Sequence, residues 1–283
     1  MANLKEIRNR IVSVSSTMQI TSAMKMVSAA KLKKAQGAII ALRPYAEKLG
    51  GVIQNLNSVD LKNPFTQTRP IRKVLLIAIT SNRGLCGAFN TNIIKNTLSQ
   101  AQNEYADATV EVITIGKKGG DILTKSLDVK AQHNELLDSS VYKETSVLAQ
   151  QIMEDFANGQ YDKVVLLYNQ FKNAATQLVN IENYLPIVYQ EIAEAQTGDY
   201  IYEPNQQEIL SELLPKSLKI QLFKAIKDSL AGEHGARMTA MHKATDNATE
   251  LRDQLKLTYN KARQAAITNE ILEIVGGAEA LKS

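Results

Sequence analysis

The sequence predicts an α/β protein, with a long antiparallel coiled coil of its N- and C-terminal helices and a central open, mostly parallel α/β domain. Near both ends of the chain, apolar residues recur at alternating steps of three and four, the spacing of paired helices. In the middle, short continuously apolar runs alternate with helical spacings, which is typical of a covered parallel sheet. Aromatic residues make up 5% of the 283 residues, which also favours long helices over a β-sandwich.

Residues 1–57 are predicted to form the N-terminal helix of the pair. Thirteen of sixteen repeat positions are apolar, and a period of about 3.5 residues indicates a left-handed supercoil with another helix. At about 1.5 Å per residue the helix spans roughly 80 Å, so it must extend beyond an ordinary domain. Pro44 lies inside the repeat without shifting its phase, which predicts a bend rather than an end. The repeat runs through Leu4, Ile7, Ile11, Val14, Met18, Thr21, Lys25, Ser28, Leu32, Ala35, Ile39, Leu42, Ala46, Leu49, Ile53 and Leu56.

Three polar residues, Thr21, Lys25 and Ser28, interrupt this apolar repeat near its centre. One interpretation is a polar layer that sets the register of the two helices. The other is a contact zone for a moving partner. Periodicity alone favours the polar layer.

Residues 70–195 are predicted to form the central α/β domain. Its apolar runs are rich in β-branched residues and alternate with two helical spacings, which indicates a parallel sheet with helices on both faces. The linkers at 57–70 and 196–206 separate this domain from the terminal helices. The predicted strands are residues 74–79, 110–115 and 164–168, with 178–181 as a further candidate, and the helical spacings cover 89–101 and 147–156.

Residues 207–283 are predicted to form the C-terminal helix. Pro215 suits its first turn, and no proline follows. Gly232 and Gly235 are weak points, each costing about 1 kcal/mol relative to alanine. Antiparallel pairing of the two terminal helices lets each bury the apolar repeat of the other. Small residues dominate the C-terminal repeat, which consists of Met241, Ala244, Ala248, Leu251, Leu255, Thr258, Ala262 and Ala265.

Charge and hydropathy restrict the classes of partner. The net charge is +4, and residues 1–36 carry seven basic side chains against one acidic one, which indicates an acidic partner surface. This stretch has no aromatic residue on which bases could stack, so nucleic acid is not expected. No apolar run approaches the roughly 18 residues of a membrane span, and the N-terminus does not resemble a signal peptide. We therefore expect any membrane link to run through a partner.

No catalytic or metal-binding motif stands out. The glycine-rich segment 80–90 resembles a phosphate-binding loop only weakly, and a plain strand-to-helix turn is the favoured interpretation for it and for 116–120. Cys86 is the only cysteine, which excludes an internal disulfide and suits a reducing compartment. His133, His234 and His242 form no motif with it. We expect a mechanical or scaffolding role without cofactors.

Long motifs at both ends of the chain resemble those of the γ subunits of F-type ATP synthases. The resemblance covers essentially the whole chain. It rests on residues 5–8 and 19–31, on 83–87 (Arg-Gly-Leu-Cys-Gly), on 202–204, and on 236–241, 244–248, 259–270 and 273–278.

The resemblance implies a non-catalytic rotating shaft inside a ring of α and β subunits, with its foot on the c-subunit ring. The shaft couples ion flow to ATP synthesis by changing nucleotide affinity at the β subunits. Residues 271–281 would turn in an apolar bearing. Contacts with the α/β ring are implied for Met24, Lys25, Arg237, Gln264, Thr268 and Glu270, and contacts with the c ring and ε for Tyr200, Tyr202 and Glu203.

Two departures from the family pattern stand out. Gly232 and Gly235 replace the usual serine and alanine, which would soften the shaft. The cysteine-pair insertion of chloroplast members is absent, so we expect a bacterial protein at the cytoplasmic face of the plasma membrane. Two alternatives stay open, a nucleotide-binding α/β domain with helical dimerisation arms and a coiled-coil spacer or chaperone arm.

Overall fold

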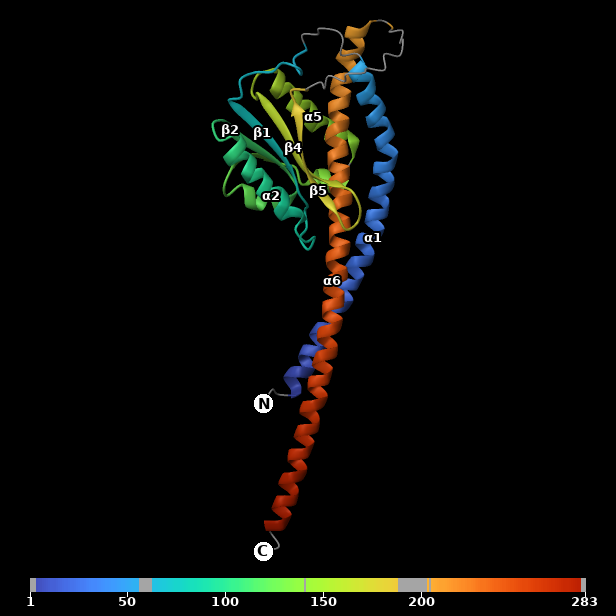
Figure 1. The fold of residues 1–283 in the computed structure, drawn as a ribbon, viewed down its shortest axis with the longest axis vertical. Helices are drawn as coiled ribbons and strands as arrows, with labels where there is room; N and C mark the ends of the chain where they lie inside the picture. Colours follow the sequence, from blue (N-terminus) through green and yellow to red (C-terminus); the bar gives the residue numbers. More distant parts are fainter. Residues whose placement is uncertain (1–3, 56–62, 140, 188–202, 204, 281–283) are drawn as a thin grey trace. The chain divides into compact units, whose positions relative to one another are not determined.

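The computed structural model describes residues 4–55, 63–139, 141–187, 203 and 205–280. They form two compact units, one made of the residues up to Val27 and from Met238 onward, the other spanning Ser28–Arg237. In chain order the elements are α1 (Leu4–Asn55), β1 (Lys73–Ile79), α2 (Phe89–Ser99), a π-helical turn (Gln100–Glu104), β2 (Thr109–Ile115), α3 (Lys117–Leu123), β3 (Asp128–Gln132), α4 (Glu135–Ser139), α5 (Tyr142–Ala157), β4 (Lys163–Phe171), β5 (Gln177–Leu185) and α6 (Gln206–Ala280) (Figure 1).

The larger unit is built on a five-stranded sheet with the order β3-β2-β1-β4-β5. The first four strands are parallel, and β5 returns antiparallel to β4. At the centre, Leu76 of β1 lies between Val112 of β2 and Val165 of β4. The chain builds outward from β1 to β3 on one side and then continues at β4 on the other, so the strand order reverses between β1 and β4.

Helices cover both faces of this sheet, as continuous apolar strands require. Alternate residues of β1 enter different cores. Leu75 and Ile77 pack with α4, α5 and the first half of α6, whereas Val74 and Leu76 pack with α2. Helix α6 contributes Leu218, Leu222, Ala225 and Ile226 to the first core, so this part of the helix belongs to the α/β domain.

The predicted strands are confirmed, and residues 178–181 lie in β5. The sequence did not indicate β3, a five-residue edge strand with alternating exposure. Residues 116–120 do join a strand to a helix, but the helix begins earlier than a five-residue turn would allow, since α3 starts at Lys117 and buries Gly119 and Gly120. A Cβ on Gly119 would lie 2.7 Å from Thr80 Oγ1, so these glycines let the helix approach the sheet, although they disfavour a helix by propensity.

The start of α6 differs from the prediction for Pro215. The helix begins at Gln206, where the Glu208 amide donates a 2.8 Å hydrogen bond to the Asn205 side chain in an N-cap. Leu210 and Leu214 are buried with Leu49 of α1 in a separate apolar cluster. This burial favours additional helical turns before the proline. Pro44 lies within α1, which continues through it as predicted.

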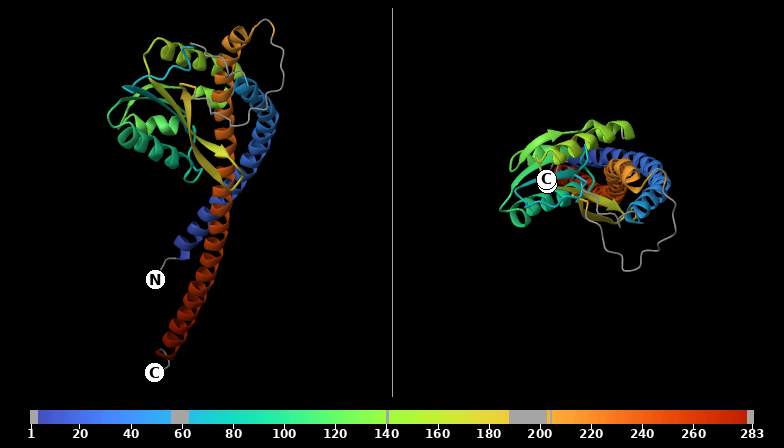
Figure 2. Two further views of the ribbon diagram at one scale, coloured as in Figure 1. Left: turned by 45° about the horizontal axis from the view of Figure 1, so that its top comes forward. Right: turned by 90° about the horizontal axis from the view of Figure 1, so that it is seen from above.

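Helices α1 and α6 run antiparallel in each unit (Figures 1 and 2). In the smaller unit, the hydroxyl oxygens of Thr21 and Thr245 lie 2.8 Å apart, and the Arg252 guanidinium lies 3.5 Å from Met18 Sδ. Residue numbers therefore rise on one helix as they fall on the other. The bond between Thr21 and Thr245 agrees with a polar layer that sets register.

Burial along α1 follows its predicted repeat. Every repeat position whose side chain is described is buried or half-buried, including Thr21, Lys25 and Ser28. The C-terminal repeat is only partly right, because Leu251, Thr258 and Ala265 are exposed. Arg252 and Tyr259 take the inward positions next to Leu251 and Thr258, which shifts the buried stripe by one residue at two turns.

Candidate functional site

The point where the strand order reverses is the natural place for a ligand in an open α/β sheet. Here the loop after β1 and the turn after β4 meet helix α6 instead. Asn169 of β4 donates a 3.1 Å hydrogen bond to the Phe89 carbonyl at the start of α2. Gly232 of α6 lies against both of these residues. The chain therefore fills its own switch point with a helix.

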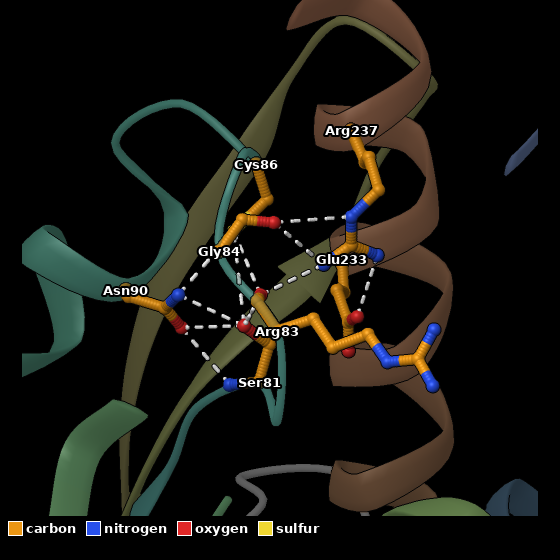
Figure 3. A network of polar contacts seen from close by, with 7 residues as sticks. All are labelled: Ser81, Arg83, Gly84, Cys86, Asn90, Glu233 and Arg237. Carbon is orange, nitrogen blue, oxygen red and sulfur yellow. Dashed lines mark hydrogen bonds and ion pairs between the residues drawn. The ribbon is translucent and has the colours of Figure 1, made fainter. Parts of the chain in front are cut away.

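The loop after β1 is held by its own polar groups (Figure 3). The Ser81 amide donates to Asn90 Oδ1 at 2.9 Å, and the Asn90 amide group donates to Ser81 Oγ at 2.8 Å and to Cys86 Sγ at 3.3 Å. Burial raises the pKa of the Cys86 thiol, outweighing the opposite effects of Ser81 and Arg237. A buried thiol of this kind is unreactive.

Arg237 binds this loop from helix α6. Its Nη2 donates to the Arg83 carbonyl at 2.9 Å and to the Gly84 carbonyl at 3.2 Å, and Nε also donates to Gly84 at 3.3 Å. Its Nη1 donates to Glu233 Oε1 at 2.6 Å, one helical turn away. The Arg237 residue is only 8% exposed. Since the loop points carbonyl oxygens at this position, it offers the wrong polarity for a phosphate group.

Glu233 completes the arrangement as a buried partner of Arg237. Burial raises the pKa of its carboxyl, and the adjacent Arg237 charge acts in the opposite direction. No motif in the sequence marked Glu233. The available signal was the spacing of Glu233 and Arg237 by four residues, which places a carboxylate and a guanidinium on one helix face.

Gly232 and Gly235 permit close packing rather than softening an exposed shaft, since α6 is helical throughout this region. A Cβ on Gly235 would lie 3.1 Å from the Ala174 carbonyl oxygen in the turn between β4 and β5. A Cβ on Gly232 would lie 3.3 Å from side-chain atoms of Phe89 and Gln177. The glycines thus allow the turn between β4 and β5, the start of β5 and the start of α2 to pack directly against α6.

Substitution of Gly235 by alanine is expected to destabilise the chain by about 1–3 kcal/mol, because the added methyl group meets backbone rather than a flexible side chain. The free energy of unfolding in urea measures this effect on the full chain. Gly37→Ala is the matched control, because Gly37 is also helical and has nothing within 4 Å of an added Cβ. Greater helix propensity is expected to stabilise that variant by up to about 1 kcal/mol. Equal stabilisation of both variants would contradict the close contact.

His234 is expected to make the chain sensitive to acid. Burial lowers the pKa of its imidazole to about 4, with Arg237 and Lys31 adding to the effect. Its Nδ1 has no hydrogen-bond partner among the described residues. Because the unfolded imidazole binds a proton near its ordinary pKa of 6.5, folding stability is lost as pH falls from there towards 4.

His234→Gln should remove this part of the pH dependence. The raised pKa of Glu233 has the opposite sign, since it costs stability as pH rises. Urea unfolding at several pH values between 7.5 and 4.5 would show a steeper loss for the wild type than for the variant. His242→Gln, at an exposed position of the same helix, is the control. An unchanged slope in His234→Gln would contradict the assignment.

The other residues predicted to contact partner subunits are exposed or half-buried where the structure describes them. Met24 and Lys25 are half-buried in α1, whereas Gln264, Thr268 and Glu270 are exposed in α6. Gln264 and Thr268 lie one turn apart on the same face of the helix, and Glu270 lies on a different stripe. Glu203 is exposed, and Tyr200 and Tyr202 lie outside the described residues.

The end of α6 is exposed over residues 263–278. Large apolar side chains occupy a wide arc of it, namely Ile267, Ile271, Leu272, Ile274 and Val275. An apolar surface on an unpaired helix indicates a binding surface.

The residues that the structure describes contain neither a membrane-spanning helix nor a metal-binding cluster. None of the helices described is both long enough and apolar enough to span a membrane. Within the same ranges, no three or more His, Cys, Asp and Glu side chains are grouped so that they could hold a metal ion.

Comparison with known proteins gives consistent matches over the whole chain. The profile of the ATP synthase family matches residues 3–281. The ATP synthase gamma chains of Flavobacterium psychrophilum and Geobacter metallireducens are 63% and 47% identical to this chain, each over 100% of both sequences. The gamma chain of Flavobacterium johnsoniae is 62% identical over 99% of each.

Two solved structures also match this chain over most of its length. The central stalk and c-ring structure of the Tetrahymena thermophila mitochondrial ATP synthase matches with a TM-score of 0.61 and 25% identity, over 80% of this chain and 99% of that one. The rotor of the Euglena gracilis mitochondrial ATP synthase has the same fold, with a TM-score of 0.66 and 22% identity over 93% of this chain and 98% of that one.

Proposed function

The chain belongs to the gamma-chain family of the ATP synthases, and we propose that its paired helices turn inside the catalytic head while its α/β domain connects them to the c ring. As the central shaft of the enzyme it couples ion flow through the c ring to ATP synthesis and hydrolysis at the β subunits. The partners are the α, β and ε subunits and the c ring. The free energies of nucleotide binding at the β subunits are coupled to one another through the rotation of an asymmetric shaft.

The exposed end of α6 carries this proposal. A helix that presents Ile271, Ile274 and Val275 to solvent needs an apolar environment. A sleeve of α and β subunits around residues 263–278 supplies it. Within this region Gln264, Thr268 and Glu270 offer hydrogen bonds and a charge to the surrounding ring.

We assign the basic N-terminal segment a second contact with the ring. Met24 and Lys25 are half-buried against the helix pair, while the neighbouring Met26 and Val27 are 65% and 56% exposed. An apolar strip flanked by lysines suits an acidic loop with apolar residues on a β subunit. Glu203, with Tyr200 and Tyr202, is assigned to the foot near ε and the c ring.

We propose that the chain performs no catalysis itself and that the complex lies at the cytoplasmic face of a bacterial plasma membrane. The nucleotide-binding alternative is not favoured, because α6 occupies the switch point and the loop there points carbonyl oxygens toward Arg237. ATP binding to the purified chain, weakened by mutation of Gly87, would support that alternative instead.

Co-expression with α and β subunits tests the proposal. The expected product contains one copy of this chain for three of each partner and hydrolyses ATP only when assembled. A chain that stays apart from α and β, or that hydrolyses ATP alone, would overturn it.

A further inference from the structure

The contacts of Arg237 reach inward, into its own chain. We call its hydrogen bonds to the carbonyls of Arg83 and Gly84, together with its ion pair to Glu233, the latch (Figure 3). Four donor contacts of the guanidinium go to these three partners. Glu233 is 7% exposed and Arg237 8%, so both charges are held inside the chain. Charge-assisted hydrogen bonds of this kind are among the stronger polar contacts in proteins.

The loop held by the latch has an unfavourable backbone conformation. Leu85 has a φ of 62°, in the left-handed region that L-residues with a branched side chain rarely adopt. The Leu85 side chain gains little from burial in return, because the residue is 64% exposed. Such a conformation persists only where the surrounding structure holds it. The latch binds the two carbonyls immediately before Leu85, and the bonds of Asn90 hold the other end of the loop.

We propose that Arg237 is a positioning residue, whose guanidinium, oriented by Glu233, fixes the loop after β1 in the conformation that presents Leu85 outward. One consequence rests on the proposed rotor function: coupling between ion flow and ATP chemistry depends on Arg237, because Arg237 holds this loop in place. A contact between Arg237 and a β subunit, as the family resemblance implies, predicts something different. In that case the loss of Arg237 would weaken coupling without loosening the loop.

Two variants separate these mechanisms. Arg237→Gln removes the charge and the forked donor, and Glu233→Gln removes only the negative charge of the internal partner. Lys243→Ala, at an exposed position of α6, controls for the loss of a positive charge. Hydrogen exchange of peptides covering residues 82–90 is measured on the full chain. ATP-driven proton pumping and ATP hydrolysis are measured on the assembled complex in vesicles.

If the latch positions the loop, both glutamine variants speed exchange at residues 82–90 about tenfold or more, the effect of losing one charge-assisted hydrogen bond. Both also lose proton pumping while they retain ATP hydrolysis, and the double variant is no worse than Arg237→Gln alone. Leu85→Asn tolerates the left-handed conformation better and is expected to restore slow exchange to Arg237→Gln. Lys243→Ala behaves as wild type in both measurements.

The proposal is overturned if exchange of the loop is unchanged in Arg237→Gln, or if Glu233→Gln pumps normally while Arg237→Gln does not. The second result would assign Arg237 to a direct contact with a partner. Failure of the wild-type chain to assemble would instead count against the rotor function. The exchange measurement on the chain would still decide whether the latch holds the loop.

Discussion

Leu222→Asp is expected to unfold the α/β domain, although Leu222 lies in a helix that the sequence predicts as part of a shaft. Leu222 is fully buried, with Leu218 and Ile226, against the same face of the sheet as α5. A carboxylate there loses its hydration without gaining a partner, and together with the lost packing this costs more than about 4 kcal/mol. Hydrogen exchange of the β1 amides in the full chain measures the loss of protection.

A matched control for this variant lies on the same helix. Leu257→Asp replaces a leucine that is 64% exposed, so the new carboxylate stays hydrated. Its expected effect on exchange in β1 is negligible, within about 0.5 kcal/mol in stability. If β1 kept its protection in Leu222→Asp, helix α6 would not be part of the domain core.

Phe156→Ala is expected to destabilise the chain by about 3–5 kcal/mol, the range for truncating a buried aromatic residue. The ring is fully buried between α5 and the sheet, and the Arg69 guanidinium lies 5.5 Å from its centroid. The variant therefore loses packing and a cation–π contact, and leaves a cavity. Urea unfolding of the full chain measures the change, and an unchanged slope would show that the native state stays compact.

Val147→Ala on the same helix separates core packing from helix propensity. Val147 is 65% exposed, and alanine is the better helix former, so a change within about 0.5 kcal/mol is expected. A similar loss in both variants would contradict the assignment of one face of α5 to the core.

Some of this architecture follows from local patterns in the sequence. The repeat from Leu4 onward predicted which residues of α1 are buried, because side chains three and four apart share one helix face. The strands around Leu76, Val112 and Val165 were predictable because a sheet covered on both faces requires continuous apolar runs. The terminal motifs likewise indicated the family that the sequence comparisons support.

Tertiary contacts decided the features that local patterns could not predict. Helix α3 forms despite Gly119 and Gly120, because a Cβ on Gly119 would collide with the side chain of Thr80 in the buried core. The edge strand β3 has no continuous apolar run, since one of its sides has no neighbouring strand. The first turns of α6 precede Pro215 because Leu210 and Leu214 are buried against Leu49.

The candidate site, too, was predictable from the sequence only in part. Gln264, Thr268 and Glu270 followed from sequence motifs, and their exposure leaves the contact with a partner as a prediction. The latch depends on Arg237 reaching carbonyls that lie 153 and 154 residues earlier in the chain. Every residue has a backbone carbonyl, so no pattern of residue types predicts which carbonyls accept hydrogen bonds from Arg237. The sequence by itself determined the two terminal helices, the helices α2 and α5, the main strands and the family. Only the packing of α6 on the loop after β1 decided what Arg237 binds.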